Sequence, residues 1–219
     1  MLLLVTDTSG RHGSVSLVHA DIGGAAELIE SVALEGGTFS AQLVPQIASL
    51  LTTHGFSKSG IGAFVVISGP GSFTGLRVGL SAIKALAEIL AKPIIAVSIL
   101  EVLALSAGAT GKVMAAIDAG RGQVYAGEYE VAATPPFIRE QLLNCDVFLS
   151  ASRNAVVATF DEALAKLARD AGCKVLQVTV PGAIEIVRAA WPKIIAGQSV
   201  SPEQLDANYI RAEIFAKST

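Results

Sequence analysis

The residues best suited to chemistry are glycines and hydroxyl side chains gathered in one stretch. Residues 68–79, SGPGSFTGLRVG, hold four glycines and follow a continuous apolar run. A glycine-rich turn at the start of a helix can bind a phosphate or carboxylate through backbone amides, or it can let the helix pack closely on a strand. The stretch has no Gly-Lys-Ser/Thr ending, which excludes a nucleotide-hydrolysing P-loop. Gly69, Gly71 and Ser72 are therefore candidates for anion binding, with a structural joint as the alternative.

A second candidate lies near the start of the chain, where Asp7, Thr8 and Ser9 follow an apolar strand. Small and hydroxyl residues in such a turn expose amides that can hold an anion. Alternatively, Asp7 and Ser9 satisfy the amides of their own turn. Asp118 occupies the corresponding position in a later strand-turn-strand segment. For Asp118 the favoured interpretation is that it satisfies the amides of its own turn.

Other residues offer little catalytic chemistry. The three histidines, His12, His19 and His54, show no i, i+4 pairing and no nearby carboxylate cluster. The chain has no G-x-S-x-G elbow, and Cys145 and Cys173 have neither metal-type spacing nor a histidine partner in the sequence. We therefore predict no catalytic residues, no metal site and two reduced thiols.

Composition predicts a folded α/β protein. Of the 219 residues, 52% are hydrophobic and 16% are charged, which argues against disorder. The formal net charge of -3 provides no basic surface for a phosphate backbone, so any role with nucleic acid should be indirect. No uncharged apolar stretch reaches the roughly 18 to 20 residues of a membrane span, and we expect a cytoplasmic protein.

Hydrophobic patterns place these turns within two similar halves, 1–108 and 109–219. The pattern VTDTSGRHGSVSLV near the start recurs weakly as AAIDAGRGQVYAGEY, which suggests a duplicated hairpin. A turn is expected at Pro135–Pro136, and a proline at 45 predicts a kink or a late start in its helix. The final helix of the second half is a candidate for packing back on the first. Strands are expected at 2–7, 13–19, 25–34, 61–68, 92–98, 112–119, 123–131, 145–150 and 173–179, and helices at 38–53, 74–91, 98–107, 160–171 and 182–196.

The two longest helices of the first half carry more apolar surface than one sheet can cover. The helix at 74–91 has two apolar stripes beside a narrow polar ridge, and the helix at 38–53 has two stripes as well. Either the helices cover each other, or they form half of an intermolecular bundle. The paired stripes are Leu76, Leu80, Ile83, Ala87 and Leu90 against Val78, Ala82, Ala85 and Ile89, and Phe39, Leu43, Ile47 and Leu50 against Ala41, Val44, Ala48 and Leu51.

Four segments together resemble one family. In order, LLLVTDTSGRHGSVSLV, GPGSFTGLRVG, AAIDAGRGQVYAGEY and ANYIRAE are similar to the TsaB (YeaZ) family, and GPGSFTGLR is a specific signature. The resemblance implies an actin-like ATPase (ASKHA) fold of two ribonuclease-H-like α/β subdomains. It also implies a non-catalytic subunit that binds and activates the TsaD-type transferase, which forms threonylcarbamoyladenosine next to the anticodon of tRNA.

The resemblance further implies partners and site residues. A TsaD-type paralogue would form a heterodimer with the chain, a TsaE-type ATPase would join, the chain alone would form a homodimer, and tRNA would be contacted only indirectly. Asp7, Thr8 and Ser9 match the family's vestige of a first phosphate loop, for which ATP or ADP would be the ligand. The alternative is an actin-like-fold ATPase, small-molecule kinase or peptidase acting alone. The expected partner interface comprises Phe39, Leu43, Leu50, Thr74, Leu76, Arg77, Leu80, Ile83, Lys84 and Ala87.

Overall fold

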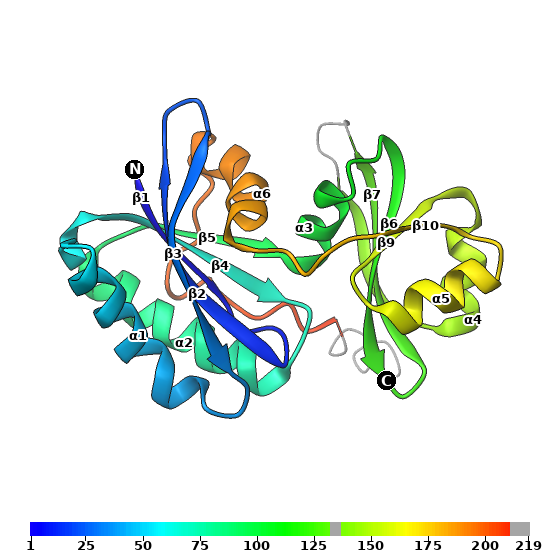
Figure 1. Ribbon diagram of the computed structural model, residues 1–219, viewed down its shortest axis with the longest axis horizontal. Coiled ribbons are helices and arrows are strands. Elements are labelled where there is room, and N and C mark those ends of the chain that lie inside the picture. The colour runs from blue at the N-terminus through cyan, green and yellow to red at the C-terminus, as the bar shows by residue number, and fades with distance from the viewer. Residues whose placement is uncertain (132–136, 211–219) are drawn as a thin grey trace. The chain divides into compact units, whose positions relative to one another are not determined.

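The computed structural model describes residues 1–131 and 137–210 (Figure 1). The chain divides into two compact units. The first unit contains Met1–Ile99 and Gly182–Asn208, and the second contains the described residues within 100–181 together with Tyr209 and Ile210. The chain thus leaves the first unit near its middle and returns to it at Gly182.

The first unit is built on a five-stranded sheet with the order β3-β2-β1-β4-β5. Its first three strands are antiparallel neighbours, whereas β1, β4 and β5 run parallel. The central strands β1 and β4 are the most apolar, as expected for strands covered on both faces. The strands are β1 (Leu2–Asp7), β2 (His12–Ala20), β3 (Ala26–Glu35), β4 (Ile61–Gly69) and β5 (Ile94–Ser98).

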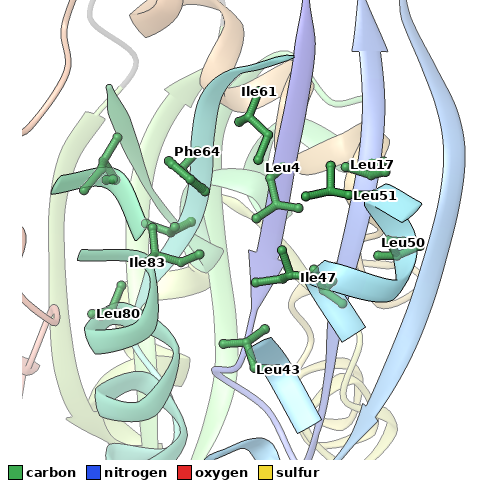
Figure 2. Close-up of a cluster of buried hydrophobic side chains, with 14 of the residues drawn as sticks. Leu4, Leu17, Leu43, Ile47, Leu50, Leu51, Ile61, Phe64, Leu80 and Ile83 are labelled. Carbon is green, nitrogen blue, oxygen red and sulfur yellow. The ribbon is translucent and has the colours of Figure 1, made fainter. Parts of the chain in front are cut away.

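Helices cover both faces of this sheet. On one face, α1 (Phe39–Thr53) and α2 (Phe73–Leu90) pack against each other and against the strands (Figure 1). Leu43 and Ile47 of α1 and Ile83 of α2 point into the core between helices and sheet (Figure 2). The other face is covered by α6 (Ala183–Ile195), which contacts all five strands. A short 3-10 helix, Lys58–Gly60, precedes β4.

The second unit repeats the strand arrangement of the first. Its sheet has the order β10-β9-β6-β7-β8, which matches the first sheet when the strands are compared in chain order. The duplication suggested by the two hairpins therefore extends over both sheets. The strands are β6 (Gly111–Gly120), β7 (Gln123–Val131), β8 (Phe137–Asn144), β9 (Val156–Thr159) and β10 (Lys174–Gln177), and the helices are α3 (Ile99–Ser106), α4 (Cys145–Ala151), the 3-10 turn Ser152–Asn154 and α5 (Glu162–Asp170).

The expected strand at 145–150 is wrong, because these residues form α4. Asn144 caps this helix, with its side-chain oxygen accepting a hydrogen bond from the Val147 amide at 2.9 Å. The third strand of the sheet is instead β8, which pairs with β7 and whose polar residues obscured a strand pattern. The sequence interpretation also missed β9. The expected Pro135–Pro136 turn lies outside the described residues.

Two smaller features complete the fold. Pro45 lies inside α1, which begins at Phe39, so of the two alternatives, a kink or a late start, the late start is excluded. Among the helices in the described ranges, none has the length and apolar character required to cross a membrane.

Candidate functional site

The turn after β1 is held together by the Asp7 side chain. The backbone amide and the hydroxyl of Ser9 both donate hydrogen bonds to Asp7 Oδ1, at 2.8 and 2.6 Å. Burial raises the pKa of the Asp7 carboxyl above its ordinary value of 3.8, and the two hydrogen bonds from Ser9 oppose this shift. The side chain therefore satisfies its own turn, as the structural alternative proposed.

The matching turn in the second unit has the same construction. There the Gly120 amide donates to Asp118 Oδ1 at 2.9 Å. In both units an aspartate near the end of the first strand accepts from the amide two residues later. This hydrogen bond is typical of an aspartate that closes a turn locally.

The glycine-rich loop packs directly onto the Asp7 turn. The Ser72 amide donates to the Ser9 carbonyl oxygen at 2.7 Å. A Cβ atom at Gly71 would overlap that same carbonyl, and one at Gly75 would overlap the carbonyl of Thr8. Glycine is thus required because two backbone segments touch.

The beginning of α2 is capped within the loop. The Ser72 hydroxyl accepts a hydrogen bond from the Gly75 amide at 3.2 Å, and the Leu76 amide donates to the Ser72 carbonyl at 2.9 Å. The amides of Ser9, Ser72 and Gly75 therefore all have acceptors within the chain. This arrangement fits a joint that aims α2.

Of the six residues predicted to bind nucleotide, the structure gathers most at this joint. Asp7, Ser9 and Ser72 are linked by hydrogen bonds, and Gly71 touches Ser9. The Thr8 side chain is buried and lies against Gly79 of α2. Gly69 instead lies next to Asn208 of the returning segment. Nucleotide binding by these residues stays a prediction.

Seven residues of the predicted partner interface are buried in the first unit's own core. Six of them belong to the core cluster between the helices and the sheet, where Leu43, Leu50, Leu80 and Ile83 are seen in Figure 2. Their burial argues against direct contact with a partner, and their part in an interface stays a prediction. The seven are Phe39, Leu43, Leu50, Leu76, Leu80, Ile83 and Ala87. The remaining three lie farther out, with Thr74 and Arg77 exposed and Lys84 half-buried.

The second stripe of each helix reaches the surface, except at Leu51 of α1, which is buried. Val44 of α1 is 48% exposed and Ile89 of α2 is 78% exposed. Phe73, the first residue of α2, is 54% exposed, and the Arg77 guanidinium lies 3.8 Å from the centre of its ring. We call the outward apolar residues of these helices the outer face. It comprises Ala41, Val44, Ala48, Phe73, Ala85 and Ile89, with the half-buried Val78 and Ala82 beside them.

The first unit also has an open cavity of about 720 Å³ away from the joint. It lies between the β2–β3 turn and the end of α6, and its lining includes Met1, Ile22 and Trp191. The Trp191 indole N–H is buried and has no hydrogen-bond partner among the described residues. No sequence pattern pointed to this cavity, because its walls come from segments about 170 residues apart.

Metal-ligating side chains are scattered. Within 1–131 and 137–210, no three of the His, Cys, Asp and Glu side chains come together as a metal site would require. His54 at the end of α1 instead contacts Glu30 of β3, with Nε2 2.6 Å from the carboxylate oxygen.

Comparison with known sequences identifies relatives of this chain. Residues 36–201 match the family model described as TsaD, tRNA N6-adenosine threonylcarbamoyltransferase. The tRNA threonylcarbamoyladenosine biosynthesis protein TsaB of Escherichia coli K12 is 30% identical over 192 residues, which is 79% of this chain and 80% of the relative. The TsaB protein of Haemophilus influenzae is 26% identical, over 98% of this chain and 95% of its own length.

Solved structures agree with this assignment. A Pseudomonas aeruginosa protein described as similar to peptidase YeaZ superposes with a TM-score of 0.75 and 26% identity, over 95% of this chain and 99% of its own. An ADPNP-bound activator of 2-hydroxyisocaproyl-CoA dehydratase from Clostridium difficile shares the fold alone, with a TM-score of 0.51 and 11% identity. The expected actin-like ATPase fold of two ribonuclease-H-like units is confirmed. The chain belongs to the TsaB (YeaZ) family.

Proposed function

We propose that this protein acts in the biosynthesis of tRNA threonylcarbamoyladenosine, as a non-catalytic subunit that binds and activates a TsaD-type transferase. Family membership supports the pathway, since the relatives carry that name. The observation that carries the binding role is the outer face, whose apolar residues the chain itself leaves exposed.

The outer face has the character of a protein interface. Its two helices pack against each other, so their exposed stripes lie on neighbouring elements of one face of the unit. Small residues such as Ala41, Ala48 and Ala85 let another helix approach closely, while Val44 and Ile89 supply larger apolar contacts. Covering such residues is worth roughly 25 cal/mol per Å² of apolar surface removed from water.

Of the other proposed partners, one would use the same face. A second copy of the chain would cover it when the transferase is absent, giving a homodimer that the heterodimer replaces. A TsaE-type ATPase would join the complex elsewhere. With a net charge of -3, the chain would contact tRNA chiefly through its partners.

An enzyme acting alone would need catalytic residues, and these would have to lie outside the apolar outer face. An ATPase or kinase would use the Asp7 turn, but there the carboxylate and the Ser9 amide bind each other. The structural observations therefore favour the accessory role.

The test places a charge on the outer face. We expect Ile89→Glu to weaken binding to the TsaD-type protein of the same organism by about 2 kcal/mol or more, which is about 30-fold, because a carboxylate would be buried in an apolar interface. Calorimetric titration measures the affinity. Assays of tRNA modification with each component omitted in turn measure activation.

The control is Ile195→Glu. Ile195 is 68% exposed and lies at the end of α6, on the other side of the sheet from the outer face. This variant should bind and activate like the unaltered protein. Equal losses from both variants, or full binding by Ile89→Glu, would contradict the proposed interface.

A further inference from the structure

Ser9 connects the turn after β1 to the beginning of α2. Its amide and hydroxyl donate to Asp7 Oδ1, and its carbonyl accepts from the Ser72 amide at 2.7 Å. Ser9 and Thr8 are both buried. The Asp7 carboxylate therefore fixes the backbone segment on which the helix rests.

The contact between this segment and α2 has little freedom. Gly75 and Gly79, one helical turn apart, both lie so close to Thr8 that neither has room for a Cβ atom. Packed interiors do not deform continuously, so a shift of the turn must move the helix or open a gap. The position of α2 thus depends on the conformation of residues 7–9.

The outer face begins immediately after the joint. Phe73 follows Ser72 directly, and Arg77 covers its ring one turn later. Ile89 lies farther along the same helix. Any change in the docking of the α2 N-terminus would therefore move residues that the proposed partner contacts.

We propose that Asp7 is a positioning residue for partner binding: it holds the 7–9 turn in the conformation that docks α2 and so presents the outer face. This inference rests on the proposed function for the identity of the partner. It assigns Asp7 a role as a hydrogen-bond acceptor, distinct from the nucleotide-binding role expected from the sequence. The burial of its carboxyl, which raises the pKa of Asp7, is consistent with a side chain kept for an internal contact.

The test compares Asp7→Ala with Asp7→Asn. Asparagine retains an oxygen that accepts from the Ser9 amide, whereas alanine removes the acceptor. We expect Asp7→Ala to bind the TsaD-type protein about tenfold more weakly, because the binding-competent pose of α2 would be only partly populated. We expect Asp7→Asn to bind like the unaltered chain. Hydrogen exchange at the Ser72 and Gly75 amides should accelerate in the alanine variant alone.

Asp118→Ala provides a matched control. It removes the same hydrogen bond from the matching turn of the second unit, where the helix after β9 is capped by Asp161 and has no glycine-rich joint. This variant should leave both partner affinity and exchange in α2 unchanged. If Asp7→Ala does not fold, Ser9→Ala removes only the hydroxyl donor and should show a smaller loss of the same kind.

Several outcomes would overturn the inference. Unchanged binding and exchange in Asp7→Ala would show that the turn does not position α2. Equal loss in Asp7→Asn and Asp7→Ala would show that the charge of Asp7 matters rather than its hydrogen-bond acceptor. Failure of the unaltered chain to bind its partner would reject the proposed function instead, while exchange in the isolated chain would still test the link between Asp7 and α2.

Discussion

Replacing Gly79 with alanine should destabilise the protein, although alanine is the better helix former. Gly79 lies in the interior of α2, where a change from glycine to alanine gains about 1 kcal/mol of helix propensity. A Cβ atom there would lie 3.1 Å from both Cβ and Cγ2 of Thr8, and closer still to its hydroxyl oxygen. Thr8 is buried and cannot swing into solvent.

Overpacking of this kind costs about 1 to 3 kcal/mol, and contact with the buried Thr8 side chain places this case near the upper end. The clash therefore outweighs the propensity gain, and the free energy of unfolding should fall by about 1 to 2 kcal/mol. Urea denaturation followed by circular dichroism measures this change, with an unchanged slope if the unfolded state is unaffected.

Two further variants test the assigned cause. Thr8→Ala removes the hydroxyl and the methyl group that the new Cβ would meet, so Gly79→Ala should cost much less in that background, with a coupling of about 1 kcal/mol or more. Ser81→Ala, on the exposed side of the same helix, should be neutral or slightly stabilising. A Gly79→Ala variant as stable as the original, or additive losses in the double variant, would refute the close-packing argument.

Two other predictions concern single sites. Because the pKa of Asp7 is raised in the folded chain, the folded state holds more protons than the unfolded state between pH 3.8 and that raised value, and the free energy of unfolding falls as the pH rises through this range. Asp7→Asn should therefore be more stable than the original protein at pH 7, and the difference should shrink below pH 3.8. Urea denaturation at the two pH values measures the free energy of unfolding. A variant less stable than the original protein at pH 7 would contradict this prediction. Gly24 has a φ of +84° and a Cβ there would lie 2.6 Å from Trp191 Cδ1, so Gly24→Ala should lower the free energy of unfolding by about 1 to 3 kcal/mol. Since Trp191 is the only tryptophan, its fluorescence should also shift, and unchanged emission would contradict the contact.

Local sequence patterns were sufficient to predict most of the strands and helices of the first unit. The apolar runs that became β1 and β4 and the glycine-rich stretch before α2 all have strong signals within a few residues. The prediction of a strand at residues 145–150 failed because a short apolar run does not distinguish a strand from a helix. Two features favour the helix here. Asn144 caps it, and β8 already pairs with β7, which leaves no position for another strand beside β7. The second feature is a tertiary contact that the local sequence does not show.

The partner face shows a different limit. Periodicity correctly divided α2 into two apolar stripes, but it does not determine which stripe faces the sheet. That depends on how the folded unit packs: Leu76, Leu80 and Ile83 are buried, whereas Ala82, Ala85 and the large Ile89 lie farther out. The joint had a stronger signal, since repeated glycines indicate close backbone approach, but the partner segment at residues 7–9 emerged only from the fold.

The return of the chain to the first unit affects how the protein is made. One face of the first sheet is covered by α6, the Val200 amide donates to the Ile94 carbonyl at the edge strand, and the Asn208 amide donates to Ser68 at the end of β4. On the ribosome, a nascent chain that has completed β5 still lacks all three contacts, so an apolar sheet surface stays open while about ninety more residues are translated. Chaperone protection during that interval, and intact synthesis of residues 182–208, thus matter to a unit whose strands were synthesised first.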